Sequence, residues 1–420
     1  MSTGASQGTV GRVVVVGGGA AGFFGAIACA EAGGGPEVLL LEKGPQFLAK
    51  VRISGGGRCN VTHACFDPRE LARRYPRGGQ ALIGPLNRFQ PKDTVAWFEA
   101  RGVSLKTEDD GRMFPTTDDS ATIVECLVRS AREAGVKTET HAGVEGILRV
   151  PGGGFEVRVS DGRRVKADRV LLATGGCRSE ALGRLAVDLG HTLEPPVPSL
   201  FALHVACPWL RELAGVAIDP VEVGAPGVAR AERGPLLVTH DGVSGPAVLR
   251  LSAWGARALH DVGYKFPLRV NWLPAETAES LASLFEKRRG EQGARRLVNS
   301  TIAPLTARLW ERLVLAAGVR REATWAGLSR DERASLIRWL RGTEFEVTGK
   351  TLNKDEFVTC GGVRLSEVQF KTMESRVCPG LHFAGELLDV DGITGGFNFQ
   401  AAWTTGWLAG RAMAAGAASG

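Results

Sequence analysis

The sequence predicts an α/β fold, with a parallel sheet, a small antiparallel meander and an inserted domain of mixed β and helical structure. Short apolar strands followed by glycine-rich turns occur at 12–19 and again at 381–396, so both ends of the chain are expected to build one sheet. Between them, three prolines in 194–198 are typical of a crossover into a second domain. The expected domains are 1–195 with 349–420, and an insert over 196–348 that is β-rich at 200–275 and helical at 276–341.

Composition places the chain among ordinary globular proteins. Its 420 residues are 44% hydrophobic and 23% charged, enough for a large core and more than one domain. No run approaches the roughly 18 apolar residues of a membrane span, and the first ten residues do not resemble a signal peptide. Eight cysteines without a C-x-x-C pair indicate a reducing compartment and no metal site. We therefore expect a cytoplasmic protein without membrane contact.

The net charge of +6 and the pI of about 9.0 come largely from arginines scattered along the chain. Such a balance attracts phosphate-rich ligands, but no basic tail for nucleic acid is visible. Nucleic acid is therefore a disfavoured partner, and a small molecule is the expected one.

The first glycine cluster has the pattern of a phosphate-binding loop. The apolar run 12–16 leads into GGGAAG (17–22), and a stretch of small and apolar residues follows at 23–32. Strand, tight turn and helix in this order place backbone N–H groups against a pyrophosphate. The predicted contacts are Gly17, Gly19, Ala20, Ala21 and Gly22.

A second apolar strand, 38–41, ends at Glu42, twenty residues after Gly22. An acid at this spacing accepts hydrogen bonds from a ribose, so the pattern predicts a Rossmann-like dinucleotide site. The loop alone does not distinguish a nicotinamide from a flavin dinucleotide.

Later segments are expected to return to the same sheet. Residues 136–161 alternate as a small antiparallel meander, and 165–176 reads as a strand that runs into a Thr-Gly-Gly turn. Near the C-terminus a strand at 381–384 precedes a glycine-rich loop, and a helix is expected from about 399 to 414. In the insert, Leu305, Leu309, Leu313 and Ala316 share one helix face.

Several motifs in one order resemble the two-dinucleotide-binding-domain flavoproteins, and within them the bacterial NAD(P)/FAD-dependent oxidoreductases named after BaiN or aminoacetone oxidase. The resemblance covers nearly the whole chain and implies an FAD domain built from both chain ends. The motifs are GGGAAG (17–22), LLEKG (40–44), SGGGRCNVTH (54–63), GRMFP (111–115), LLATGG (171–176), THDGVSGPAVLRLS (239–252), VTCGGV (358–363), KTMESR (371–376) and LHFAGELLDVDGITGGFNFQAAWTTG (381–406).

The resemblance also implies roles for individual residues. Glu42 would bind the adenosine ribose, the backbone near Val144 would lie at the adenine, and SGGGRCN would lie beside the ribityl chain and flavin ring. Phe397 stands where a tyrosine is usual in the family. The implied cofactor contacts beyond the phosphate loop are Glu42, Lys43, Ser54, Gly56, Gly57, Arg58, Cys59, Asn60, Val144, Thr174, Gly175, Gly176, Gly385, Glu386, Gly396, Phe397 and Asn398.

The sequence leaves the catalytic residues open. Cys59 is a redox-thiol candidate, although a small filler beside the flavin is favoured because no partner cysteine follows at C-x-x-C spacing. His240 and Asp241 form a proton-relay dyad or, as favoured, a structural turn, since neighbouring strand residues point to opposite faces. Residues 359–362 are candidates for the far face of the ring, and Asp389 or Asp391 for the substrate.

The expected reaction is hydride transfer at flavin N5 to or from a small organic substrate, in a cleft between the two domains. No second G-x-G-x-x-G follows a strand, so NAD(P)H is a candidate transient donor without a domain of its own. The alternatives are a flavin-containing RNA-modifying or nucleic-acid-associated protein and a non-enzymatic flavin redox sensor. The sequence does not determine the oligomeric state.

Overall fold

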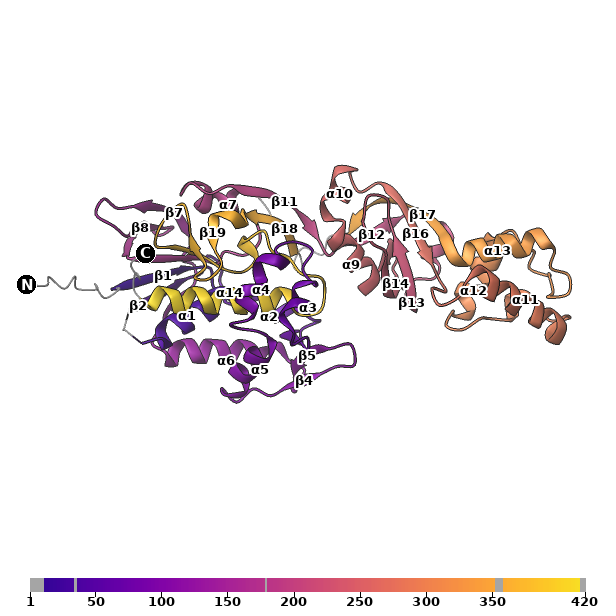
Figure 1. Cartoon of the computed structure of the whole chain (residues 1–420), viewed down its shortest axis with the longest axis horizontal. Helices are drawn as coiled ribbons and strands as arrows, with labels where there is room; N and C mark the ends of the chain where they lie inside the picture. The colour runs from indigo at the N-terminus through magenta and orange to yellow at the C-terminus, as the bar shows by residue number, and fades with distance from the viewer. Residues whose placement is uncertain (1–10, 34–35, 178–179, 352–357, 416–420) are drawn as a thin grey trace, which may run out of the picture. The chain divides into compact units, whose positions relative to one another are not determined.

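The chain divides into two compact units, Met1–Pro198 with Lys354–Gly420 and Ser199–Asn353 (Figure 1). The structure is a computed structural model that describes residues 11–33, 36–177, 180–351 and 358–415. Across these residues, none of the helices combines the length and the apolar character that a membrane crossing requires.

A mainly parallel sheet forms the centre of the first unit. Its first two strands each begin with a partly buried charged residue and continue with four buried valines or leucines, as expected for parallel strands covered on both faces. The parallel strands, in spatial order, are β21 (Leu381–Phe383), β10 (Arg169–Leu172), β1 (Arg12–Val16), β2 (Glu37–Leu41) and β6 (Lys137–Glu139). The antiparallel strands β20 (Glu374–Ser375) and β19 (Val368–Gln369) complete it.

The antiparallel meander differs in extent from the prediction. It contains β7 (Val144–Arg149), β8 (Phe155–Val159) and β9 (Arg164–Ala167), whereas the start of the predicted segment forms β6 of the parallel sheet. The single strand predicted over 165–176 is divided into β9 and β10. Asp168 lies between them, and its carboxylate accepts hydrogen bonds from the N–H groups of Gly11 and Arg12 at 2.8 and 2.7 Å. This contact ties the turn to the start of β1.

The first and last helices of the chain pack along each other (Figure 1). Glycines allow the contact between α1 (Ala20–Glu31) and α14 (Phe397–Ala414), because a Cβ on Gly406 would lie 2.5 Å from Ala21 O. A Cβ on Gly410 would lie 2.3 Å from Gly25 O. Both chain ends are therefore held in one domain.

Smaller helices and strands complete the first unit. The helices are α2 (Ala49–Ile53), α3 (Pro68–Ala72), α4 (Gly79–Leu86), α5 (Pro91–Glu99), α6 (Ser120–Glu133) and α7 (Glu180–Val187), together with the 3-10 turns η2 (Leu365–Glu367) and η3 (Gly385–Leu387). The strands are β3 (Thr62–His63), β4 (Leu105–Thr107) and β5 (Arg112–Pro115) in one small sheet, and β11 (Leu193–Ser199) with β18 (Val358–Val363) in another.

The second unit is a closed six-stranded barrel with helices. Around the barrel the strands are β12 (Ala202–Val205), β15 (Gly242–Ser244), β14 (Glu232–Val238), β13 (Ala217–Gly224), β16 (Phe266–Asn271) and β17 (Thr343–Thr351). The helices are α8 (Pro208–Arg211), α9 (Pro246–Trp254), α10 (Ala256–Asp261), α11 (Ala278–Gln292), α12 (Ala307–Ala316) and α13 (Arg330–Gly342), with η1 (Leu297–Asn299). Fully buried Trp272, Trp310 and Trp325 belong to its core.

Two local details of this unit differ from the sequence pattern. Helices α9 and α10 occur inside the segment predicted as short strands, where Gly245 and Pro246 provide a helix start after β15. The insert was expected to end at 348, whereas β17 continues to Thr351 and pairs with β16 and β12 in the barrel.

Candidate functional site

The glycine-rich turn after β1 leaves the N-terminus of α1 open. Gly17 has φ +110°, and a Cβ there would lie 2.4 Å from Ala173 O. A Cβ on Gly22 would lie 1.9 Å from Gly17 O, so the turn and helix require glycine at both positions. A Cβ on Gly19 would meet nothing within 4 Å, and α1 has no side-chain cap and no acid in its first turn. The first amides of α1, from Gly19 through Ala20 and Ala21, can therefore bind an anion.

Glu42 lies against this loop at the end of β2. Its carboxylate accepts hydrogen bonds from Gly18 N and Gly44 N, both at 2.7 Å. The start of the meander lies beside it, because Ala142 N donates to Glu42 O at 2.8 Å and a Cβ on Gly143 would lie 3.3 Å from Lys43 Cγ. Lys43 is exposed, and Val144 begins β7 directly afterwards. The structure thus brings Glu42, Lys43 and the start of β7 together beside the glycine-rich turn.

The turn after β10 and the loop after β21 meet at the same end of α1. A Cβ on Gly385 would lie 2.8 Å from Ala21 Cβ, and one on Gly176 would lie 2.6 Å from Glu386 Oε1. The hydroxyl Oγ1 of Thr174 is buried and has no hydrogen-bond partner within the part of the chain that the structure describes. Gly175 borders open space, since a Cβ there would meet nothing within 4 Å. A polar ligand can complete this cradle.

Glu386 has two protein partners that the sequence pattern did not indicate. Lys50 Nζ donates to one carboxylate oxygen at 2.6 Å, and the backbone N–H of Thr359 donates to the other at 2.9 Å. Lys50 lies on α2 and Thr359 on β18, so Glu386 joins three distant segments. No local motif signals this contact, because it depends on the tertiary fold.

The SGGGRCN segment is a tight loop in which four residues have a left-handed backbone conformation. Gly55, Gly56, Gly57 and Cys59 all have positive φ, and Ser54 ends α2 with its hydroxyl donating to Val51 O at 3.0 Å. Substituents on Gly56 or Gly57 would meet nothing within 4 Å. Cys59 is fully buried, and burial raises the pKa of its thiol to about 12. A thiol that remains protonated at neutral pH serves as a packing residue.

Arg58 is paired with protein carboxylates. Its guanidinium donates to Glu108 at 2.6 Å, lies 3.5 Å from Asp118, and stacks 3.9 Å from the centre of the Phe114 ring. The resemblance implied a cofactor contact for Arg58, and in the structure its guanidinium has Glu108 and Asp118 as charged partners.

Asn60 connects this loop to the N-terminus of α14. With its side-chain amide in the orientation that satisfies both groups, Asn60 donates to Thr62 O and accepts from Gly396 N, both at 3.0 Å. Nearby, the ring of Phe397 stacks on His63 with 4.7 Å between ring centres. Asn398 holds the preceding loop, because its amide donates to Gly392 O at 2.9 Å and accepts from Gly392 N at 2.8 Å. Both asparagines therefore bind protein backbone.

Polar side chains along α14 hold further loops. Gln400 Oε1 accepts from the hydroxyls of Thr62 and Thr94 at 2.6 and 2.9 Å, and Trp403 Nε1 donates to Val61 O at 2.9 Å. Thr405 Oγ1 accepts from Gly385 N at 2.9 Å. The signal in the sequence was the presence of these polar residues in a helix otherwise rich in small apolar residues.

Several open candidates have defined surroundings. His240 and Asp241 are exposed in a two-residue turn, which the hydrogen bond from Thr239 N to Gly242 O closes at 2.8 Å. Asp391 is fully buried and paired with Arg77, which disfavours the suggested contact with substrate. No group of three or more His, Cys, Asp or Glu suited to a metal ion occurs among the residues with described positions.

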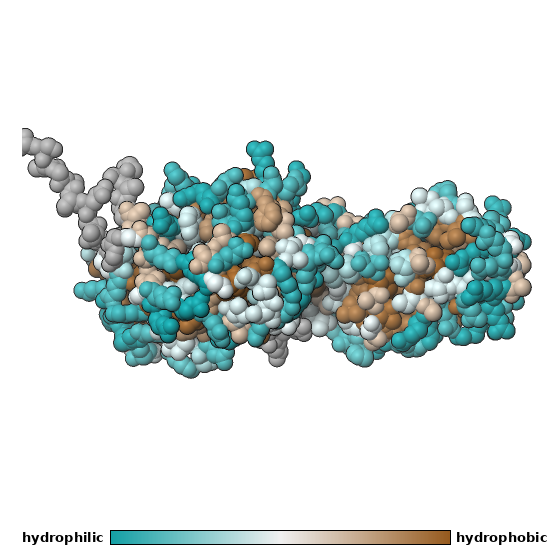
Figure 2. Space-filling view, turned by 90° about the horizontal axis from the view of Figure 1, so that it is seen from below, coloured by the Kyte–Doolittle hydropathy of each residue, from teal (hydrophilic) through white to brown (hydrophobic). Residues whose placement is uncertain are grey.

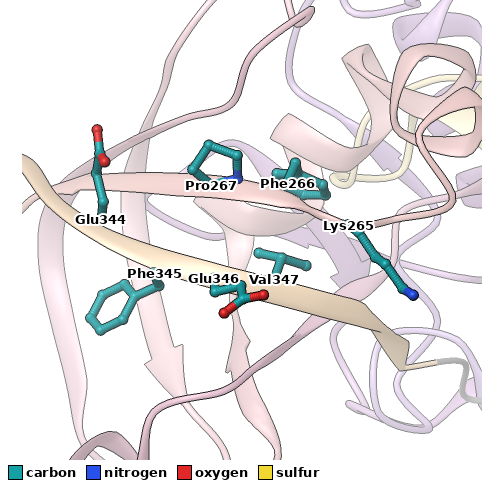
Figure 3. Close-up of a pocket in the computed structure, with 7 residues that line it drawn as sticks. All are labelled: Lys265, Phe266, Pro267, Glu344, Phe345, Glu346 and Val347. Atoms are coloured by element: carbon teal, nitrogen blue, oxygen red, sulfur yellow. The ribbon is translucent and has the colours of Figure 1, made fainter.

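A surface groove of about 430 Å³ lies in the second unit, along β16 and β17 (Figure 3). It lies outside the glycine loops described above, and its outward side chains, among them Lys265 and Glu344, are exposed. Its lining residues are Lys265, Phe266, Pro267, Glu344, Phe345, Glu346 and Val347.

Comparison with known proteins provides the family. Residues 11–412 match the family described as "HI0933-like protein Rossmann domain". The chain is 33% identical over 411 residues to the 3-dehydro-bile acid delta(4,6)-reductase of Clostridium scindens. The aligned residues make up 96% of this chain and 99% of the relative. It is 30% identical over 404 residues to the ribosomal RNA dihydrouridine synthase of Escherichia coli, which covers 94% of this chain and 96% of that relative.

Among solved structures, the chain resembles the 3-ketosteroid-delta4-(5alpha)-dehydrogenase of Rhodococcus jostii RHA1 with a TM-score of 0.50 over 98% of both chains. At 15% identity this likeness concerns the fold. The predicted Rossmann-type FAD-binding fold, the oxidoreductase class and the family resemblance are confirmed. The chain belongs to the HI0933-like Rossmann family, the group of BaiN-like and aminoacetone oxidase-like FAD-dependent oxidoreductases.

Proposed function

We propose that the first unit binds FAD through the loops described above and uses it to reduce a carbon–carbon double bond conjugated to a carbonyl group. The observation that carries the cofactor site is the open, uncapped N-terminus of α1 beside the unsatisfied Thr174 hydroxyl. In this assignment Gly17, Gly19 and Gly22 contact the pyrophosphate. Glu42 accepts from the adenosine ribose.

The remaining assigned contacts divide into direct and indirect ones. Thr174 to Gly176, Gly385, and the open glycines Gly56 and Gly57 line the cofactor. Asn60, Asn398 and Glu386 act through the loops that they hold, since their polar atoms already have protein partners.

The two full-length relatives support the type of reaction. A bile acid delta(4,6)-reductase and a dihydrouridine synthase, as named, both saturate a double bond next to a carbonyl. When bound and reduced, FAD would supply a hydride to one carbon of the double bond, and a proton from water would complete the other carbon. The N–H groups in the first turn of α14 carry partial positive charge and would favour the negative charge that the flavin gains at its pyrimidine edge on reduction.

NAD(P)H is the proposed electron donor, bound transiently at the flavin without a domain of its own. Anaerobic titration of the yellow protein with NADH and with NADPH tests this assignment. Bleaching of the flavin by one of them within seconds is expected. If neither NADH nor NADPH reduces the flavin, although dithionite does, another donor reduces it.

A single-turnover experiment tests the reaction itself. Protein reduced anaerobically is mixed with 4-androstene-3,17-dione, a 4-ene-3-ketone, and with the saturated ketone as the matched control. Return of the flavin absorbance with the enone alone, together with a product heavier by two hydrogens, is expected. Equal reoxidation of the flavin by both ketones contradicts the proposed reaction. If neither ketone reoxidises it, the same experiment is repeated with RNA, and a failure there also contradicts the proposed reaction.

RNA is a second candidate substrate, and the charge distribution favours it. Residues 199–353 contain 21 Lys and Arg against 16 Asp and Glu, so the second unit carries +5 of the net charge of +6. Arg289, Arg296 and Arg320, from the α11–α13 region, are exposed, and the end of this region is mainly hydrophilic on the face shown in Figure 2. Exposed arginines bind phosphate backbones, with an affinity that falls as salt rises.

Charge reversal separates the two substrates. The triple variant Arg289→Glu, Arg296→Glu, Arg320→Glu is compared with a single exposed arginine of the first unit, Arg132→Glu. If RNA is the substrate, the triple variant weakens binding of ribosomal RNA at least tenfold and Arg132→Glu has little effect. Equal RNA affinity in both variants, with steroid turnover retained, assigns the small molecule.

A further inference from the structure

Arg77 forms a buried ion pair with Asp391, which lies in the loop that precedes α14. The Asp391 side chain is fully buried and the Arg77 side chain is 14% exposed. Arg77 Nε donates to Asp391 Oδ1 at 2.5 Å, and Arg77 Nη2 donates to Asp391 Oδ2. The guanidinium therefore binds the carboxylate in a bidentate manner, with two parallel hydrogen bonds. The backbones of the two residues also form an antiparallel bridge.

Neighbouring contacts extend this pair into a continuous junction. Ile393 N donates to Arg74 O at 2.9 Å, and the Tyr75 hydroxyl donates to Phe397 O at 2.7 Å. A Cβ on Gly78 would lie 2.5 Å from Val390 Cγ2. Residues 74–78 therefore run along the whole loop that leads into the first residue of α14.

The charge of Asp391 matters because of this location. A carboxylate six residues before the start of α14 opposes the partial positive charge of the helix N-terminus. Inside a protein, water screens such a charge weakly, so its effect reaches neighbouring groups. Arg77 cancels it, because a guanidinium remains charged at any physiological pH.

We propose that Arg77 and Asp391 are positioning residues that set the reduction potential of the flavin. The pair fixes the loop before α14 and keeps the field at the helix N-terminus positive. This inference rests on the proposed FAD site, in which the N-terminus of α14 faces the pyrimidine edge. Reduction places negative charge at that edge, so an added positive charge favours the reduced flavin and an added negative charge disfavours it.

Two variants test the inference against wild type, each measured for FAD affinity and for flavin reduction potential by dye equilibration. Asp391→Asn removes the negative charge and leaves Arg77 charged, so we expect the reduced flavin to be favoured about tenfold, or about 30 mV for a two-electron couple. The double variant Arg77→Gln, Asp391→Asn removes both charges and keeps hydrogen-bonding groups. We expect its equilibrium constant for flavin reduction to stay within twofold of the wild-type value.

A matched control comes from another ion pair of the same unit. Glu31, on the last turn of α1, pairs with Arg101 at 2.6 Å. Glu31→Gln removes one carboxylate at the opposite end of α1 from the glycine-rich turn. The equilibrium constant for flavin reduction in this variant should stay within twofold of the wild-type value, because an exposed charge is screened.

The outcomes separate this inference from the FAD assignment. If wild type fails to bind FAD, the proposed function is wrong. If wild type binds FAD and Asp391→Asn has an unchanged potential at full occupancy, the inference is wrong and the FAD site stands. If Asp391→Asn does not fold, the double variant decides, since a tenfold shift in its reduction equilibrium would contradict a balanced pair.

Discussion

The amide of Asn60 bridges Thr62 O and Gly396 N, with both hydrogen bonds at 3.0 Å. This contact joins a glycine-rich loop near the start of the chain to the N-terminus of the last helix. A Cβ on Gly396 would lie 2.6 Å from Thr62 O, so the two segments are already in close contact. The proposed flavin end of the site is therefore built by protein contacts between distant segments.

Replacing Asn60 should weaken that contact. Asn60→Ala leaves Gly396 N and Thr62 O without their side-chain partner, which costs about 1–3 kcal/mol. We expect a lower free energy of unfolding in urea and weaker FAD binding. The control is Asn87→Ala, which removes an exposed hydrogen bond to Ile83 O and should change both quantities little. An Asn60→Ala protein as stable as wild type would show that the bridge contributes nothing.

Two glycines of the phosphate loop should respond differently to alanine. In Gly22→Ala the new Cβ would lie 1.9 Å from Gly17 O, so the protein without FAD should already be destabilised by several kcal/mol. In Gly19→Ala the Cβ meets nothing within 4 Å, so stability without FAD should be unchanged. FAD affinity should nevertheless fall at least tenfold, because the methyl group would occupy the proposed pyrophosphate position. Full FAD affinity in Gly19→Ala contradicts that position.

Glu42→Ala should weaken FAD binding. The substitution removes the proposed ribose acceptor and also leaves Gly18 N and Gly44 N without a charged partner, each worth about 1.5–3 kcal/mol. Glu42→Gln keeps one acceptor oxygen and should be affected less. The measurement is flavin occupancy after dialysis, and complete occupancy in Glu42→Ala would exclude the adenosine assignment.

Cys59 should be dispensable for chemistry. Its thiol is fully buried with a pKa raised to about 12 by burial, so the reactive thiolate is scarce at pH 7. Cys59→Ala should retain at least half of the single-turnover rate, and iodoacetamide should not modify Cys59 in the folded protein. The partly exposed Cys65 is the comparison site in the same mass spectrum. Loss of turnover with normal FAD binding would restore the redox-thiol hypothesis.

Stability should fall as the pH drops below about 6.5. Burial lowers the pKa of His382 to about 4, and burial also lowers the pKa values of His63 and His191. The folded state therefore holds these rings neutral, and their contribution is complete above the unfolded value of about 6.5 and is lost progressively as the pH falls toward 4.

Urea unfolding at pH 7.5 and pH 5 measures this loss. His382→Asn keeps a donor for Thr372 O and removes the titration, so its stability should depend less on pH. His240→Asn, an exposed position, is the control and should keep the wild-type dependence. Equal pH dependence in all three proteins would contradict the role of His382.

Local sequence patterns were enough to predict the glycine-rich turn between β1 and α1, the acid that follows β2, and the family. These features are local, because a strand, three glycines and a helix start define their own geometry within about thirty residues. Continuous runs of valine and leucine likewise predict β1 and β2, since strands that are buried on both faces are apolar throughout.

The tertiary structure alone decided which partners the polar side chains have. Asn60 and Asn398 were expected at the cofactor and bind backbone instead, while Lys50 meets Glu386 and Arg77 meets Asp391 across hundreds of residues of chain. A hydrogen bond is worth little until both groups are buried and aligned, so its partner depends on packing that no local pattern records. The packing of α1 on α14 brings the two chain ends together and settles those partners.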